Sequence, residues 1–123
     1  MTHIAILGTG PLPIEQDSYI YSSSNRTWHI AQSLLAAGHR VHVIAFRPTR
    51  TENGVRINDT EHRRFSDGEF SLDSVEEITH FRNDAFLKER ISEFGAEVLI
   101  GVNAFPSARA AALDLTIPFW ADM

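Results

Sequence analysis

The stretch of sequence that most constrains the fold runs from residue 3 to residue 46. It begins with a short apolar run, residues 3–7, and ends with a second one, residues 41–46. Both runs are continuous rather than alternating, which is typical of strands covered on both faces of a parallel sheet. Between them, apolar residues recur at helical spacing until Gly38, a residue type suited to ending a helix. This pattern predicts a βαβ unit.

The loop after the first predicted strand begins with Gly8, Thr9 and Gly10. Two prolines follow closely, and because proline has a fixed φ and no N–H group, a helix cannot start at once. We therefore expect a loop up to about residue 25, where Asn25 or Ser24 can cap the helix. The expected buried face of this helix carries Thr27, Ala31, Leu34 and Leu35, with Trp28 beside them.

Residues 47–78 carry few structural signals. Turns are indicated at Asn53-Gly54 and Asp67-Gly68, and a short strand is expected at residues 55–57. Because so long a connection is unusual in a compact domain, we expect here a functional flap, a mobile loop, or helices and strands that the sequence pattern does not reveal. Its acidic side chains are expected to form a solvated face: Asp67, Glu69, Asp73, Glu76 and Glu77.

The last third of the chain continues the alternation of helix and strand. A helix is expected after Asn83 or Asp84, with Gly95 as its stop, and then a buried strand at residues 97–102. Asn103 can cap a further helix that begins near residue 106, and a last strand is expected at residues 117–121. The apolar sides of the two helices are expected to carry Leu87, Ile91 and Phe94 in the first, and Ala108, Ala111, Ala112 and Leu115 in the second.

This alternation predicts an α/β fold with a doubly wound, mostly parallel, Rossmann-like sheet in one domain, residues 1–123. Right-handed crossovers place the first strand at the centre, the strand at 41–46 on one side, and the strands near 97 and 117 on the other. The loops after Leu7, Val102 and Ala121 are then expected to meet at the carboxyl edge of the sheet. Because α/β proteins bind ligands at that edge, it is the predicted site.

Composition excludes several classes of function. The formal net charge of -5 and the scattered cations argue against a nucleic-acid binder, because phosphate neutralisation needs concentrated Lys and Arg. The absence of cysteine rules out disulfides and thiolate metal sites. No apolar stretch approaches the roughly 18 residues of a membrane span, and no signal peptide is recognisable. We therefore expect a cytoplasmic protein without a transmembrane segment.

The sequence also lacks the familiar cofactor-binding motifs at the predicted edge. Gly8-Thr9-Gly10 begins like the dinucleotide motif G-x-G-x-x-G, but Pro13 replaces the third glycine and the helix starts too late to point at a pyrophosphate. Arg47, rather than a ribose-binding acid, follows the second strand, and it can in principle meet a 2′-phosphate. The histidines lack the spacing of a metal site, and the serines at 22–24 lack a nucleophile elbow. We expect no cofactor and no metal.

Several segments together resemble a known family. They are I-L-G-T-G-P-L-P at the first strand, S-N-R at the helix entry, L-L-A-A-G-H-R-V-H-V-I around Gly38, A-E-V-L-I-G, and I-P-F-W-A-D near the end. This set resembles the N-terminal domain of GT-B glycosyltransferases, most nearly the retaining, glycogen-synthase-like group called family 4. The resemblance implies a hexosyltransferase that moves a sugar from a nucleotide-sugar donor to a sugar or lipid acceptor. In that family the N-terminal domain holds the acceptor and a C-terminal domain holds the donor.

The resemblance also implies binding roles for residues of the first loop and helix. Gly8, Thr9 and Gly10 match the loop that faces the interdomain cleft, where small residues let backbone N–H groups approach the donor; alternatively, the two glycines only turn the chain. Asn25 and Arg26 match the helix entry, where polar groups can hold an acceptor hydroxyl or phosphate. Asn25 can equally be a cap, and Arg26 can equally be solvated.

Two further candidates follow later strands. Many relatives carry a histidine just after the fifth strand, where this sequence has Asp122, so either Asp122 takes the catalytic role or the corresponding residue lies beyond the end. A carboxylate there can orient an acceptor hydroxyl by accepting its hydrogen bond. Asn103 follows a strand that ends at the same edge and is a further candidate for substrate binding.

The sequence lacks the donor-binding half of the family, so we expect a fragment that is inactive alone and that can self-associate through an exposed interdomain face. The alternative is a non-enzymatic Rossmann-like or flavodoxin-like module for ligand binding or regulation. A receiver domain is disfavoured, because Gly8-Thr9 stands where its acidic pair belongs and Asn103 follows the strand that would carry its phosphoacceptor Asp.

Overall fold

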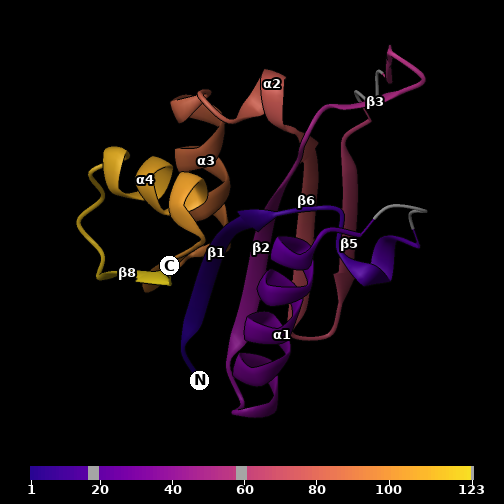
Figure 1. Cartoon of the computed structure of the whole chain (residues 1–123). Helices are drawn as coiled ribbons and strands as arrows, with labels where there is room; N and C mark the ends of the chain where they lie inside the picture. The colour runs from indigo at the N-terminus through magenta and orange to yellow at the C-terminus, as the bar shows by residue number, and fades with distance from the viewer. Residues whose placement is uncertain (17–19, 58–60, 123) are drawn as a thin grey trace.

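The computed structural model describes residues 1–16, 20–57 and 61–122 and has an α/β architecture built on a mostly parallel sheet (Figure 1). The six strands have the order β5-β6-β2-β1-β7-β8, and only β5 is antiparallel to its neighbour. Their bounds are β1 His3–Thr9, β2 Arg40–Arg47, β5 Arg63–Asp67, β6 Phe70–Glu76, β7 Val98–Val102 and β8 Phe119–Asp122. The predicted Rossmann-like fold is therefore confirmed, including the position of the first strand between the second strand and the later ones.

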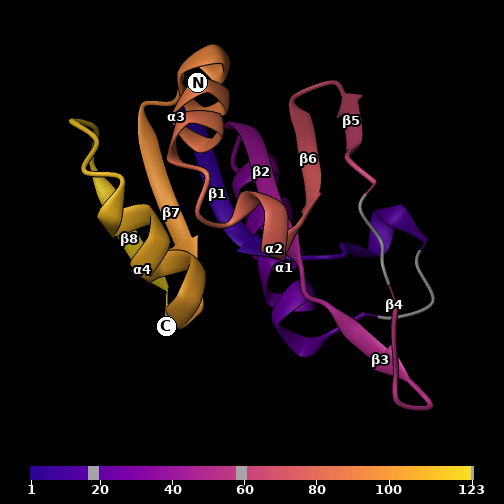
Figure 2. The ribbon, with the colours of Figure 1, turned by 90° about the horizontal axis from the view of Figure 1, so that it is seen from above.

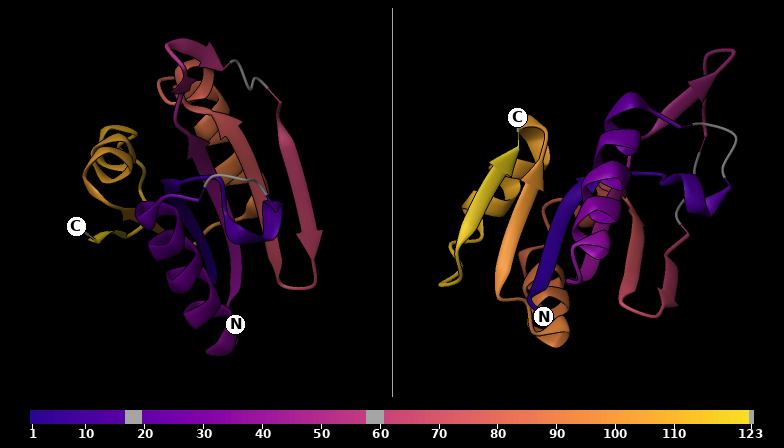
Figure 3. Two further views of the ribbon diagram at one scale, coloured as in Figure 1. Left: turned by 45° about the vertical axis from the view of Figure 1, so that its right-hand side comes forward. Right: turned by 90° about the horizontal axis from the view of Figure 1, so that it is seen from below.

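Helices cover both faces of this sheet. One face carries α1 (Ser22–Ala36), which lies in front of the strands in the right-hand view of Figure 3. The opposite face carries α3 (Asp84–Phe94) and α4 (Ala104–Ala112), with the short α2 (Glu77–His80) beside them, all turned toward the viewer in Figure 2. Each face has its own apolar core, because side chains of a strand alternate between the two sides.

The predicted glycine stops are confirmed. Gly38 has a φ of 91°, and its N–H bonds to the Leu35 carbonyl at 3.0 Å while the His39 N–H bonds to the Leu34 carbonyl at 3.1 Å. This pair of bonds is the Schellman motif, which satisfies the last carbonyls of α1. Gly95 ends α3 in the same left-handed region, with a φ of 73°.

Two predicted helix starts are wrong by a few residues. α1 begins at Ser22 instead of Asn25, so Asn25 lies inside the helix and caps nothing, and Ser24 is likewise helical. α4 begins at Ala104 instead of near residue 106, although Asn103 does hold the N-cap position. By contrast the predicted start of α3 is confirmed, since the helix begins at Asp84, and the Asn83 side chain caps it by accepting a hydrogen bond from the Phe86 N–H at 3.1 Å.

The predicted buried side of α4 is also wrong. Pro106, Ser107 and Ala110 are buried, with Leu113 just beyond the helix. The alanines expected inside, Ala108, Ala111 and Ala112, are exposed. Alanine occurs on nearly every side of this helix, so the apolar pattern gives almost no direction, and the close approach of Ser107 to Gly101 decides the orientation instead.

The region 47–78 differs most from expectation. A small antiparallel hairpin, β3 (Arg50–Glu52) and β4 (Val55–Ile57), contains the predicted strand and turns through Asn53-Gly54. A second hairpin turns through the predicted signal at Asp67-Gly68 and joins β5 to β6. β6 pairs with β2 inside the main sheet, so this part of the region is neither a flap nor a loop.

Candidate functional site

The ends of β1, β7 and β8 and the start of α1 meet at the carboxyl edge of the sheet, as predicted. The clearest contact there joins Arg26 on α1 to Asp122 at the end of β8. The Arg26 Nε lies 2.5 Å from Asp122 Oδ2, and Nη2 lies 2.7 Å from Oδ1. This is the two-bond geometry in which the guanidinium fork matches a carboxylate.

A groove of about 420 Å³, here called the carboxyl-edge groove, runs beside this pair. Asn25, Arg26 and Asp122 line it together with Ser22 and His29. Three of the predicted site residues therefore lie around one surface groove, although Asp122 is 96 residues from Arg26 in the sequence.

The ion pair fixes the protonation state of both partners. Hydrogen bonds from Arg26 lower the pKa of Asp122 below its ordinary value, and the same contact raises the pKa of Arg26. The carboxylate is thus ionised at neutral pH and accepts hydrogen bonds readily. A lowered pKa makes it a weaker general base, so the geometry favours orientation of a ligand hydroxyl over proton abstraction.

The first-strand loop is used mainly inside the domain. The Thr9 N–H donates to Thr27 Oγ1 at 3.3 Å, and the Gly10 N–H donates to the Phe46 carbonyl at 2.9 Å. A Cβ on Gly8 would lie 2.5 Å from the Thr27 side chain, so glycine is required there for close packing between β1 and α1. These contacts explain Gly8, Thr9 and Gly10 without a ligand; their predicted role in binding stays a prediction.

Asn103 lies next to Asp122. Its N–H donates to the Asp122 carbonyl at 2.6 Å, and its φ of 68° is unusual for a residue other than glycine. Among the described residues, Asn103 Nδ2 is buried without a hydrogen-bond partner, as are Ser24 Oγ in α1 and Ser107 Oγ in α4. Buried polar atoms normally have partners, so these three atoms at the beginnings of two helices have spare hydrogen-bonding capacity.

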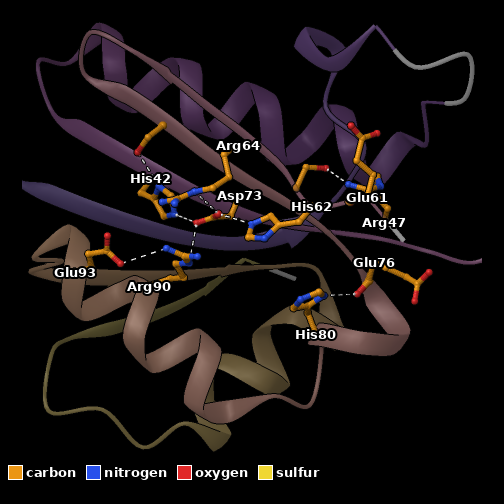
Figure 4. A network of polar contacts seen from close by, with 12 residues as sticks. His42, Arg47, Glu61, His62, Arg64, Asp73, Glu76, His80, Arg90 and Glu93 are labelled. Atoms are coloured by element: carbon orange, nitrogen blue, oxygen red, sulfur yellow. Dashed lines mark hydrogen bonds and ion pairs between the residues drawn. The ribbon is translucent and has the colours of Figure 1, made fainter. Parts of the chain in front are cut away.

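A buried polar network, which is not predicted from the sequence, lies on the face of the sheet that carries α3. Asp73 in β6 is fully buried, which contradicts its expected place on a solvated face. Its carboxylate contacts His42 Nε2 at 2.9 Å, His62 Nε2 at 2.7 Å, Arg64 Nε at 3.1 Å and Arg90 Nε at 3.8 Å (Figure 4). We call these five residues the Asp73 network.

Two opposing effects act on Asp73. Burial alone raises the pKa of a carboxyl group, but hydrogen bonds from His42 and His62, with the charge of Arg90, lower the pKa of Asp73 to about 2. Asp73 is therefore an ionised carboxylate held in the protein interior by its partners.

A second polar cluster lies on the opposite face of β6. The buried Glu15 carboxylate accepts hydrogen bonds from the Leu12 N–H at 2.6 Å, Ser74 Oγ at 2.5 Å and Arg63 Nη1 at 3.0 Å. Arg47 is buried beside it and donates to Ser74 Oγ at 2.8 Å and to the Glu61 carbonyl. Arg47 is thus engaged within the domain. The cluster connects the 3₁₀ turn Pro13–Glu15 to β5 and β6 of the sheet.

A weak signal for the buried network exists in the sequence. His42 interrupts the apolar run of β2, and Ser71 and Asp73 alternate with Phe70 and Leu72 along β6. Polar residues at every second position of a strand mark one face of a sheet. The contacts of His42 with Ser71 and Asp73 span 29 and 31 residues of the chain, so the pattern alone does not show that this face is buried.

Large apolar side chains are exposed near β8. Trp120 is 70% exposed and Phe105 is 78% exposed, and Phe119 is partly exposed as well. Self-association through such a surface stays a prediction.

Within residues 1–16, 20–57 and 61–122, no helix has the length and apolar character needed to cross a membrane. The same residues contain no group of three or more His, Asp or Glu side chains arranged to hold a metal ion. Comparisons with models of protein families, with curated proteins and with solved structures found no match.

Proposed function

We propose that this domain is the acceptor-binding half of a glycosyltransferase that uses a nucleotide-sugar donor, and that the carboxyl-edge groove holds the acceptor. The observation that carries the proposal is the convergence of Asn25, Arg26 and Asp122 on that groove. These are residues to which the resemblance to GT-B enzymes assigns the acceptor side. The order of the parallel strands, with β1 at the centre, agrees with such a half.

The chemistry of the groove suits a polyhydroxylated ligand. A sugar hydroxyl both donates and accepts hydrogen bonds, and the groove offers an ionised carboxylate, a guanidinium and an amide. The Arg26–Asp122 pair is surface-exposed and contributes little to stability, so a ligand can replace one of its hydrogen bonds at small cost. In this proposal Asp122 orients an acceptor hydroxyl and Arg26 binds a neighbouring hydroxyl or phosphate.

One observation favours the alternative of a non-catalytic ligand-binding module. The Thr9 and Gly10 N–H groups, which the resemblance directs toward the donor, already have partners inside the domain. A module that binds a small ligand at the same edge needs neither a donor nor a general base.

Titrations followed by the amide signals of the ¹⁵N-labelled protein separate these functions. The probes are methyl α-mannoside and methyl α-glucoside as acceptor sugars, and AMP and FMN as ligands of an ordinary Rossmann-like module. We expect the sugars to shift the signals of Asn25, Arg26 and Asp122 in the native protein and not in Arg26→Gln. Arg82→Gln, a change of an exposed arginine on the other face of the sheet, is the matched control.

The outcomes are distinct. Shifts with either sugar support the proposal that the carboxyl-edge groove holds an acceptor. Shifts with AMP or FMN at the same residues, and none with the sugars, would support the non-enzymatic module instead. If none of the four probes shifts these signals, both functions are contradicted.

A further inference from the structure

A second pocket lies far from the carboxyl edge. It has a volume of about 430 Å³ and is formed between α3 and the hairpin of β5 and β6. Three arginines from three different elements line it: Arg40 at the start of β2, Arg64 on β5 and Arg90 on α3. We call it the hairpin pocket. It is on the face of the sheet opposite to α1, so it is separate from the carboxyl-edge groove.

The acidic groups of this pocket are already occupied. Both oxygens of Asp73 have cationic or imidazole partners, and its pKa of about 2 keeps it ionised, so it has no proton to donate. Glu93, the other carboxylate of the lining, pairs with Arg90 Nη1 at 3.3 Å. The pocket therefore offers few free acceptors.

The donors are in excess. Each guanidinium has five N–H donors. Arg64 meets Asp73 through Nε at 3.1 Å and is 56% exposed, so its terminal nitrogens remain available. Arg90 Nε is buried and lies 3.8 Å from Asp73 Oδ2, which is too far for a hydrogen bond. It has no hydrogen-bond partner among the described residues. Arg40 reaches Glu69 only at 3.9 Å.

Charge and shape then define the ligand. Three guanidinium groups face two carboxylates in the lining, so an added anion is favoured, and arginine forks match the oxygens of a phosphate in pairs. The volume exceeds that of a bare ion and is in the range of small-molecule sites, and Phe65 and Phe94 supply apolar walls. We propose that the hairpin pocket binds the phosphate group of a small phosphate monoester, with the organic part against these aromatic walls.

The test follows the arginine Nε–Hε signals of the ¹⁵N-labelled protein during titration with phenyl phosphate, benzoate and phenol. These probes share the ring and differ in the charged group. We expect the signals of Arg64 and Arg90 to shift with phenyl phosphate, more weakly with benzoate, and not with phenol. The affinity for phenyl phosphate should fall with added salt, because the contact is electrostatic.

Arg64→Gln should weaken phenyl phosphate binding by about tenfold, the loss expected for one charge-assisted hydrogen bond. Arg64 is chosen because it is exposed, and a thermal melt checks that the variant is folded. Arg82→Gln, also exposed, should bind as the native protein does. Arg26→Gln should also leave the affinity for phenyl phosphate unchanged. The proposals for the hairpin pocket and for the carboxyl-edge groove can therefore be contradicted independently. Equal binding of phenol, no response of Arg64 and Arg90, or full affinity in a folded Arg64→Gln protein overturns the proposal.

Discussion

The Arg26–Asp122 pair and the Asp73 network both join a carboxylate to cationic side chains, but they do so in different surroundings. Arg26 and Asp122 are exposed to solvent at the carboxyl edge, whereas Asp73 on β6 is fully buried and contacts Arg90 of α3. An exposed pair exchanges partners with water at little cost, while a buried charge depends on every partner it has. The comparison indicates that the first pair is suited to binding a ligand, and that the buried Asp73 carboxylate is suited to stabilising the fold.

The largest expected effect comes from removing the buried charge. Asp73→Asn leaves Arg90, His42 and His62 around a neutral amide, and breaking a buried ion pair in this way costs about 3 kcal/mol or more. Urea unfolding measures this loss in the free energy of unfolding. Asp67→Asn, on the exposed strand β5, is the matched control and should change stability by less than about 0.5 kcal/mol. Similar losses of stability in Asp73→Asn and Asp67→Asn would contradict a special role for the buried carboxylate.

Lowering the pH should reduce the stability that the same network contributes. Because the pKa of Asp73 is lowered to about 2 in the folded protein, its contribution is fully present above the unfolded pKa of about 4. It is lost as the pH falls from about 4 to about 2, and the shift corresponds to about 2 kcal/mol. Urea unfolding at a series of pH values should show this loss in the native protein and a shallower one in Asp73→Asn. Identical pH profiles would show that Asp73 is not the group responsible.

A smaller effect tests the first-strand loop. Gly8→Ala places a methyl group 2.5 Å from the Thr27 side chain, so overpacking should cost about 1 to 2 kcal/mol. Thr27→Ala in the same chain should recover part of that loss, because it removes the two closest atoms. A thermal melt of the single and double variants checks this coupling. If Gly8→Ala leaves stability unchanged, close packing is not the reason for glycine there.

The smallest stability effect is expected at the exposed pair. Arg26→Gln should lower the free energy of unfolding far less than Asp73→Asn does, and less again at high salt, because the pair is exposed to solvent. Urea unfolding at low and high salt measures the change. A loss as large as that of Asp73→Asn would mean that the pair holds β8 in place, which would weaken its assignment to ligand binding.

Local features of this fold are predictable from the sequence because their causes are local. Gly38 and Gly95 end helices by their own left-handed backbone, and the continuous apolar runs identify β1, β2 and β7. The meeting of the ends of β1, β7 and β8 also follows from topology, since parallel strands end at one edge.

Features that depend on distant partners are not predictable in the same way. Asp73 looks like a surface acid in the sequence, because His42 lies 31 residues before it and Arg90 lies on a separate helix. β6 is not predicted from the sequence because Ser71 and Asp73 break its apolar pattern. The buried side of α4 is not predictable because its alanines give no direction. Ser107 lies close to Gly101, and Ala110 and Leu113 belong to the buried core of that face.

The most direct test of the account is the amide spectrum of the ¹⁵N-labelled protein during titration with methyl α-mannoside and methyl α-glucoside. If the carboxyl-edge groove holds an acceptor sugar, the signals of Asn25, Arg26 and Asp122 shift progressively with at least one sugar, while those of His42 and Asp73 stay in place. Unchanged signals at the groove with both sugars, or shifts only at the Asp73 network, would contradict the assignment of the two regions.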